Sequence, residues 1–543
     1  MRAPRKVFAA SLAVLFVAAR SAAAPVPGSS PAEAGPRICF SLAARPALDG
    51  ERPIGAGPAV RSETPGLRLR PRLARAWSEW GAFVTVSSVN YWLSNSFPED
   101  ADYRLTLDDQ VRRLAFLDGV KFDSNQFSLN WSHILGGALY YQFGRTNHTS
   151  WPAALLMSVA GSTWWETIGE PKEVVAINDQ IITGLGGFPV GEAWYQASQF
   201  LLHRPAFLER ALSVINPFLL INRWLDRRDA AIRAYDQPGW HDFSVFVGGR
   251  RLASDGSAAR TDLYLGVRTR LIELAEYGRP GEVHRRFKDT AVSELGFDIA
   301  VQNGRAAETR WAAQAVPWGW FDQRIDRDGN GHSLMFGFGS AFEFFKKRPL
   351  ADYDATPVPV KSDLSRLHLD EPRAFTDKLA ILHVAGPVLD WTIFRRGLRL
   401  RTVVEGYGDF GLINATALND YSAVHPVAGL WTTVFYYGYF YGFGGSGAAS
   451  FSLDYRGLEA RGRAETGVWS SARFLDRFQT EVTNRARIVD ARTLFRGGLG
   501  WTLPRTSLKI FADLEYVRRG GRLDGVKAAR VETKTYVGLA FSF

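Results

Sequence analysis

The spacing of apolar residues changes along the chain, from helical in the first half to alternating in the second. From about residue 240 onward, apolar residues recur at every second position, which is the period of a β-strand. Near the C-terminus, Val537, Leu539 and Phe541 point one way, while Tyr536 and Gly538 point the other. The same alternation runs through residues 263–271, 334–344, 460–466 and 508–516. The pattern predicts a mainly β region over residues 235–543.

Each alternating segment is about ten residues long, the length that a tilted strand needs to cross the hydrocarbon of a membrane. One face of these segments is apolar, and the other carries charges and glycines, as strands do when they face a polar lumen. We therefore predict an outer-membrane-type antiparallel β-barrel of about twelve strands. The alternative is a soluble periplasmic β-rich binding protein, because the strands of a soluble sandwich also alternate.

The residues before the barrel divide into three parts. Residues 1–24 begin with Arg2, Arg5 and Lys6, continue with an apolar run and end in small residues, which is the layout of a signal peptide. Residues 25–75 are rich in Pro, Gly, Ala and Arg and predict a flexible linker. Residues 76–230 show helical spacing and predict a mostly α-helical module that plugs or caps the barrel.

Composition and charge indicate which classes of molecule the protein contacts. The 543 residues carry a net charge of +10, and aromatic residues make up 13%, which is typical of proteins with interfacial aromatic belts. No nucleic-acid-binding module accompanies the basic excess, so we expect outer-membrane lipid as the partner and no nucleic acid. The single cysteine, Cys39, excludes an intrachain disulfide. A C-terminal strand ending in Phe543 predicts recognition by the barrel-assembly machinery, and with it an outer-membrane location in a Gram-negative-type bacterium.

Polar residues and small residues punctuate the helical module in a distinctive order. The stretch from Gly161 to Ala193 contains Trp164-Trp165-Glu166, Asn178-Asp179 and a glycine run that closes on Glu192. With the upstream stretch 125–148, this order resembles the domain of unknown function 3943, an uncharacterised bacterial envelope family, over about residues 88–228. The family commonly has His-Pro where this chain has His133-Ile134, a departure that would relax the turn there. The resemblance implies a fold and no mechanism.

The motif residues predict a buried polar cluster. Buried polar and charged side chains must be hydrogen-bonded or paired, because an unpaired buried charge is costly. Arginines of the module and inward arginines of the barrel are available as partners. A plug held by such pairs inside a polar lumen accounts for the whole set and gives a structural or transport function. The cluster residues are Asn130, Arg145, Glu170, Asn178, Asp179, Glu192, Asn216, Asn222 and Arg223.

An alternative function is an envelope-lipid hydrolase or acyltransferase embedded in the outer membrane. A nucleophilic serine needs a histidine base that a carboxylate orients, and His133, Ser162 and Glu166 supply these residue types. Ser162 and Glu166 are four residues apart and share a helix face, while Ser132 is a second candidate nucleophile. The GxSxG elbow that positions the serine in many hydrolases is missing from the sequence.

A metal site has weaker support. Glu166, Glu170, His133 and Asp179 would suit a carboxylate-rich helical site, but the Glu-x-x-His signature of such sites is missing. We therefore expect neither a metal nor another cofactor in the helical module.

A second metal candidate lies in the barrel region. Asp326, Asp328 and Asn330 resemble the first half of a calcium loop, but Gly337 stands where the bidentate glutamate belongs. A hairpin turn explains these residues better, because Asp, Asn and Gly favour turns.

Overall fold

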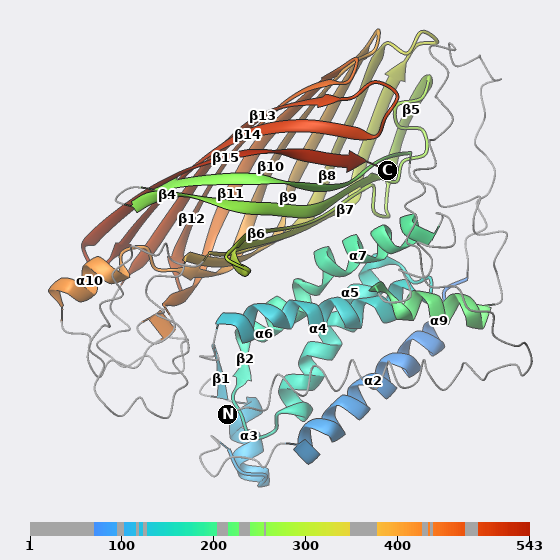
Figure 1. Ribbon diagram of the computed structural model, residues 1–543. Coiled ribbons are helices and arrows are strands. Elements are labelled where there is room, and N and C mark those ends of the chain that lie inside the picture. Colours follow the sequence, from blue (N-terminus) through green and yellow to red (C-terminus); the bar gives the residue numbers. More distant parts are fainter. Residues whose placement is uncertain are drawn as a thin grey trace, which may run out of the picture.

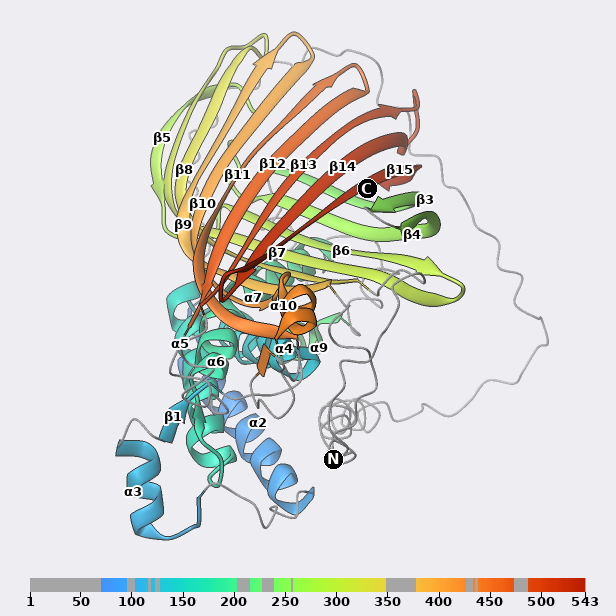
Figure 2. The same ribbon diagram turned by 90° about the vertical axis from the view of Figure 1, so that its left-hand side faces the viewer.

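The computed structural model describes residues 70–94, 103–115, 119–122, 127–202, 215–226, 239–254, 257–347, 377–425, 433–434, 438–472 and 487–542. The predicted signal peptide, most of the predicted linker and Phe543 lie outside these residues. The described chain forms a helical module followed by a β-barrel, which lie side by side (Figures 1 and 2). The first described helix begins at Leu73, within the predicted linker, and the barrel begins at Trp240.

The helical module contains α-helices, two π-helical turns and a two-stranded parallel sheet. Its elements in chain order are α2 (Leu73–Ser94), α3 (Leu107–Ala115), β1 (Val120–Lys121), α4 (Phe127–Arg145), α5 (Trp151–Trp164), η2 (Trp165–Gly169), β2 (Val175–Ala176), α6 (Ile177–Asp179), η3 (Gln180–Leu185), α7 (Gly187–Leu202) and α9 (Pro217–Asp226).

In the described part of the barrel region, thirteen further strands occur, together with the short helix α10. They are β3 (Trp240–Ser254), β4 (Ser257–Ile272), β5 (Gly281–Phe287), β6 (Val292–Gln302), β7 (Arg305–Ile325), β8 (Gly331–Lys347), β9 (Asp377–Arg395), β10 (Leu398–Asn414), α10 (Leu418–Val424), β11 (Tyr439–Tyr455), β12 (Leu458–Ser471), β13 (Ile488–Thr502), β14 (Leu508–Leu523) and β15 (Val526–Ser542).

The sheet closes on itself. Its 13 strands follow the order β5-β7-β6-β4-β3-β15-β14-β13-β12-β11-β10-β9-β8, and β7 also pairs with β8. Twelve antiparallel strands therefore form a ring, and β5 adds to the part of β7 that β6 leaves uncovered. This confirms the predicted barrel and its strand number. A closed ring leaves no unpaired edge along these twelve strands, as a membrane-spanning sheet requires.

The two ends of the barrel differ in the length of their connections. The turns β7–β8, β9–β10, β11–β12 and β13–β14 are short and lie at the end where β3 begins and β15 ends. The strands that the long connections 348–376, 415–438 and 472–487 join have their connected ends at the opposite end of the barrel. In bacterial barrels the short turns lie on the periplasmic side and the long loops outside the cell.

Ion pairs that cross the barrel identify which side chains face the lumen. Arg310 on β7 donates to Glu515 on β14 at 2.8 Å, although these strands are not neighbours in the sheet. In the same way, Arg492 on β13 donates to Glu343 on β8 at 2.7 Å. Because side chains alternate along a strand, the residues next to Arg310 and Glu343 must face outward.

The outward face is apolar and exposed over much of the barrel. Val247, Leu263, Leu499 and Val537 are between 50% and 67% exposed, although they are aliphatic. They lie on β3, β4, β13 and β15, within five adjacent strands. Exposed Phe451 of β11, Leu389 of β9 and Phe336 of β8 continue the apolar surface farther around the wall, so it is a belt and not a single patch. An apolar outer belt around a polar interior is the arrangement of a membrane barrel. A soluble sandwich would instead bury these side chains against a second sheet.

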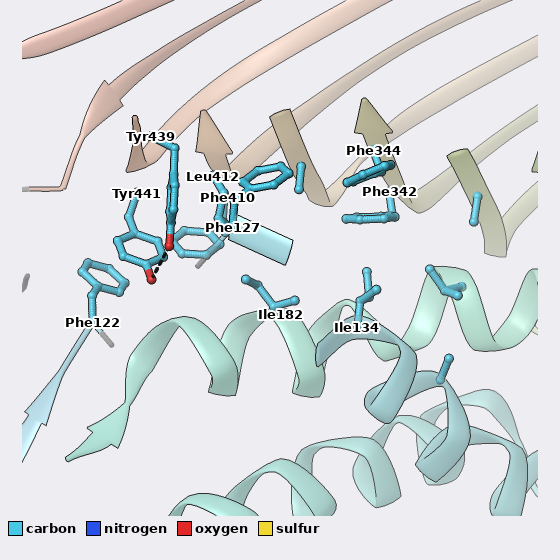
Figure 3. Packing of buried hydrophobic residues seen from close by; sticks show 14 of the residues in the cluster. Phe122, Phe127, Ile134, Ile182, Phe342, Phe344, Phe410, Leu412, Tyr439 and Tyr441 are labelled. Atoms are coloured by element: carbon cyan, nitrogen blue, oxygen red, sulfur yellow. Dashed lines mark hydrogen bonds between the residues drawn. The ribbon is translucent and has the colours of Figure 1, made fainter. Parts of the chain in front are cut away.

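The helical module packs on this outward face. Trp131 of α4 lies 4.2 Å from Phe344 and 6.0 Å from Trp311, measured between ring centroids. Both partners follow or precede a lumen-facing residue directly, so both belong to the outside of the wall. Phe122 stacks at 4.8 Å on Tyr441 of β11. Figure 3 shows this cluster between the helices and the strands. On β8, Phe336 and Phe338 are exposed, and the module covers Phe342 and Phe344 of the same face.

The predicted plug is therefore corrected: the helical module lies against the outside of the barrel, and other groups occupy the lumen. The reason is that an apolar helix face suits an apolar outer wall better than a lumen lined with charges. Lys534 illustrates the lumen packing, since it is 1% exposed and lies 3.1 Å from Glu308 and 3.4 Å from Glu515.

Two connections of the barrel place residues inside its two mouths. At the short-turn end, the β4–β5 connection places Tyr277 inside, where its hydroxyl lies 2.7 Å from that of Thr392. Lumen-facing Gln323 donates to the main chain of Glu276 at 2.8 Å. At the other end, Asp490 accepts hydrogen bonds from the main-chain amide and hydroxyl of Thr416, just after β10. The described residues of both connections thus help to fill the ends of the lumen.

Candidate functional site

The three candidate catalytic residues meet at one short segment, residues 176–179. Ser162 lies in the last turn of α5, and its hydroxyl donates to the main-chain oxygen of Asp179 at 3.0 Å. Glu166, on the π-helical turn η2, accepts from the main-chain amide of Ala176 at 2.8 Å. From α4, His133 Nδ1 lies 3.3 Å from Oδ1 of Asp179. π-Helical turns are frequent at functional sites, and η2 and η3 flank this segment.

The geometry of Ser162 differs from that of an activated nucleophile. Its side chain is 1% exposed. A hydroxyl has a single hydrogen, and this one is directed to the main chain of Asp179 and not to a histidine base. His133 is the accessible member of the set, with a side chain 27% exposed. Asn178 donates to Asp179 at 2.7 Å and so holds the carboxylate that faces His133.

Arg145 and Glu192 form the most buried ion pair of the module. Arg145 Nε lies 2.8 Å from Glu192 Oε2, and Tyr141 donates to the same oxygen at 2.7 Å. Arg145 also reaches Asp289, at the break between β5 and β6, at 3.0 Å. Burial by itself would lower the pKa of Arg145, but the charges of Glu192 and Asp289 raise it well above its usual value. The guanidinium therefore stays charged and links the module to the barrel wall.

The asparagines of the set hold the last helix, α9. Asn216 precedes Pro217, and its side-chain oxygen accepts from the amide of Leu219 at 3.1 Å, as an N-cap does. Its amide donates to Gln142 on α4 at 3.0 Å. Asn222 donates to Thr146 at 2.9 Å. These contacts give Asn216 and Asn222 structural roles, whereas Arg223 lies partly exposed on α9.

Asn130 lies at the interface with the barrel. It is fully buried, and its amide donates to the hydroxyls of Tyr439 at 2.7 Å and Tyr441 at 2.5 Å. Both tyrosines belong to the outward face of β11, so Asn130 adds a polar contact to the apolar cluster between α4 and the wall. Its hydrogen bonds fix the register of α4 on the wall, because they join it to single atoms of two neighbouring side chains.

Arg113 is a central residue that the sequence did not indicate. Its guanidinium donates to the main-chain oxygens of Thr167 at 3.1 Å, Glu170 at 2.9 Å and Glu173 at 2.5 Å, and also to that of Glu166. Burial lowers the pKa of Arg113, and nearby Glu166 partly offsets this. Arg113 thus binds the carbonyl groups that a helix end leaves without partners. Only an arginine within a charged, amphipathic run marked it in the sequence.

Glu170 and the turn candidates have local partners. The Glu170 carboxylate accepts a hydrogen bond from the indole of Trp165 at 3.0 Å.

Asp326, Asp328 and Asn330 form the β7–β8 turn, in which Asp326 accepts a hydrogen bond from the main-chain amide of Asn330 at 2.8 Å. This hydrogen bond lowers the pKa of Asp326. Across the described ranges of the chain, groups of three or more His, Cys, Asp or Glu side chains arranged to hold a metal are absent.

Among the helices that the structure describes, none has both the length and the apolar character of a membrane span.

Solved structures with a related fold are bacterial outer-membrane barrels. The translocator domain of the autotransporter NalP from Neisseria meningitidis is 9% identical, with a TM-score of 0.21; the match covers 63% of this chain and 99% of that one. The toluene transporter TodX from Pseudomonas putida is 9% identical, with a TM-score of 0.21 and coverage of 59% and 93%. The anion-selective porin from Comamonas acidovorans is 9% identical, with a TM-score of 0.19 and coverage of 56% and 99%. These likenesses concern the barrel fold alone.

Sequence comparison adds a family for the helical module. The search of curated proteins gives no match to this chain. Residues 119–220, from β1 to α9, match the model of a family described as a domain of unknown function, DUF3943. The predicted resemblance to this family is thereby confirmed over residues 119–220.

Proposed function

We propose that the chain is an outer-membrane protein of structural type, whose sealed barrel anchors the helical module at its lipid-facing wall. The observation that carries the proposal is the position of Trp131, which packs on Phe344 and Trp311 outside the wall. Behind that wall, the lumen is crossed by the buried Arg310–Glu515 pair. A barrel that conducts needs a hydrated path along its axis, and a barrel that anchors does not.

Replacement of Trp131 tests the docking. Trp131→Ala removes the aromatic contacts to β7 and β8, and we expect it to lower the free energy of unfolding of the module by about 2–3 kcal/mol. Far-ultraviolet circular dichroism during urea unfolding in detergent measures the helices, and heat-dependent gel mobility measures the barrel. Only the helical transition should move. Trp224→Ala is the matched control, since Trp224 of α9 is 76% exposed. Equal effects of the two variants would contradict docking through Trp131.

Conductance separates the structural function from transport. The folded protein should produce no stepwise conductance in planar lipid bilayers, because side chains and the β4–β5 connection occupy the lumen. Flotation with liposomes verifies insertion, and a porin in the same bilayers verifies the recording. Reproducible conductance steps from the inserted wild-type protein would overturn the proposal in favour of transport.

Hydrolysis or acyl transfer on an envelope lipid is a second candidate, which one observation favours. His133 is partly exposed, and its Nδ1 faces the Asp179 carboxylate at 3.3 Å, the arrangement that orients a histidine base. For this function, His133→Ala should abolish release of fatty acid from phospholipid vesicles while the barrel keeps its gel mobility. Ser132→Ala and Ser162→Ala then identify the nucleophile. If wild type releases no more fatty acid than His133→Ala, this candidate is excluded.

A further inference from the structure

A groove on the outside of the barrel combines an apolar wall with a cationic rim. It lies at the short-turn end of β8 and β9 and has a volume of about 530 Å³. Trp391 and Ile393 of β9 line it, together with His332 of β8 and two consecutive arginines, Arg395 and Arg396. His332 and Ile393 are cross-strand partners on the outward face, so the groove opens toward the membrane and not toward the lumen.

The apolar part of the groove continues the lipid-facing belt. Trp391 is 45% exposed, and Leu389, two residues farther along β9, is 37% exposed. Phe336, the cross-strand partner of Leu389, is exposed to the same extent. These side chains form one outward column that runs from the groove toward the middle of the barrel. An acyl chain lying in this column would bury aromatic and aliphatic surface along its length.

The cationic part lies where the headgroup of such a lipid would be. Among the residues that the structure describes, neither Arg395 nor Arg396 has an ion-pair partner, and both are exposed. The Arg396 amide donates to the side chain of Asn330 at 3.0 Å, which joins the β9–β10 turn to the β7–β8 turn and closes one side of the groove. That turn holds two acids, of which Asp326 accepts a hydrogen bond from Asn330; among the described residues, neither Asp326 nor Asp328 forms an ion pair with Arg395 or Arg396. Two arginines therefore remain available for an anion.

We propose that this groove binds an anionic glycerophospholipid of the leaflet on the short-turn side, with the phosphate at Arg395 and Arg396 and an acyl chain along Trp391. A guanidinium suits a phosphate because it offers parallel donors, and basic pockets at the membrane surface bind anionic headgroups. The column of exposed apolar side chains favours a lipid over a soluble phosphate. The site is independent of whether the helical module is an anchored structural unit or an enzyme.

The test uses a charge-removing double variant with a matched control. Arg396 has a positive φ of 44°, so asparagine, which tolerates that conformation, preserves the turn. The test variant is Arg395→Gln/Arg396→Asn. The control is Arg456→Asn/Arg505→Asn, because these two arginines also have positive φ, 49° and 63°, and lie in turns at the same end, outside the groove. Both variants lose two charges. Heat-dependent gel mobility verifies that each barrel is folded.

Native mass spectrometry of the full-length protein in detergent then measures binding of dioleoyl phosphatidylglycerol. Wild type and the control should bind one molecule tightly, and the test variant should bind it about thirtyfold more weakly, since each arginine near an anionic headgroup contributes about fivefold. Dioleoyl phosphatidylcholine should bind wild type and the test variant alike. Equal phosphatidylglycerol binding by the two variants overturns the site. Displacement of the lipid by glycerol 3-phosphate at comparable concentration overturns the lipid in favour of a soluble phosphate.

Discussion

The Glu515→Ala variant should lower the free energy of unfolding of the barrel by about 3–5 kcal/mol, which is the usual cost of removing one partner of a buried ion pair. Glu515 is fully buried and accepts from Arg310 across the lumen at 2.8 Å. Lys534 lies 3.4 Å from the same carboxylate. Without Glu515, Arg310 and Lys534 lose one of the two carboxylates that they share, and Glu308 alone must balance both cations. Urea unfolding in detergent, followed by heat-dependent gel mobility, measures the loss.

The control for Glu515 is another arginine–carboxylate ion pair that is more exposed to solvent. Arg399 and Asp454 lie 2.9 Å apart, but their side chains are 27% and 34% exposed. Asp454→Ala should cost less than about 1 kcal/mol, since solvent screens exposed pairs. Glu515→Gln keeps the shape of the side chain and removes its charge, so it should resemble Glu515→Ala if charge is the cause. If Glu515→Ala lowers the free energy of unfolding no more than Asp454→Ala does, the conclusion that buried ion pairs stabilise the lumen is contradicted.

The Arg145→Ala variant should destabilise the helical module by a similar amount, about 3–5 kcal/mol, because it leaves the Glu192 carboxylate buried without a cation. Glu192 is 0% exposed, and its remaining donors are the Tyr141 hydroxyl and the Gln196 amide, both at 2.7 Å. The helices should unfold at a lower urea concentration than in the wild type, as measured by far-ultraviolet circular dichroism. The barrel should keep its gel mobility, because its ring of strands closes without Arg145.

Two further variants separate charge from packing at Arg145. Arg104→Ala removes an exposed arginine of the same module and should change stability by less than about 0.5 kcal/mol. The double variant Arg145→Ala/Glu192→Gln replaces the stranded carboxylate by a neutral amide, so it should recover part of the loss. A double variant as unstable as Arg145→Ala alone would show that the packing of the arginine stem, and not its charge, holds this part of the module.

The strands of the barrel were predictable because their signal is local. In a strand, residues two apart share a face, so the spacing of Val537, Leu539 and Phe541 predicts an apolar outward row even when the partner strands are not known. The aromatic stretch 430–445 was not predictable in the same way, because both a strand and a short helix fit it. Its second part proved to be the start of β11, where Tyr439 and Tyr441 receive the hydrogen bonds of Asn130.

The site residues were predictable as a set but not as pairs. Buried Asn130, Asp179, Glu192 and Asn222 stood out because polar residues interrupted apolar helices, and each has a partner in the fold. The identity of that partner depends on distances that sequence spacing does not contain. Arg145 and Glu192 are 47 residues apart, and Arg113 lies 53 residues from Glu166. Arg113 was missed altogether, since nothing in its neighbourhood distinguishes a buried arginine from a solvated one.

The sequence by itself determined the strands of the second half and which of their faces is apolar, because the alternation of apolar and polar residues follows from the geometry of single strands. That the sheet closes into a barrel followed from the pairing of the strands in the structure. Only the tertiary structure decided which side of the wall receives the helical module and what fills the lumen. The outward row of β8 reads as one apolar face broken only by Ser340, yet Phe336 and Phe338 are exposed while Phe342 and Phe344 pack against the helical module. A strand position that faces lipid and one that packs against an apolar helix both require an apolar residue. The sequence therefore does not distinguish the two kinds of position, and only the packed structure does.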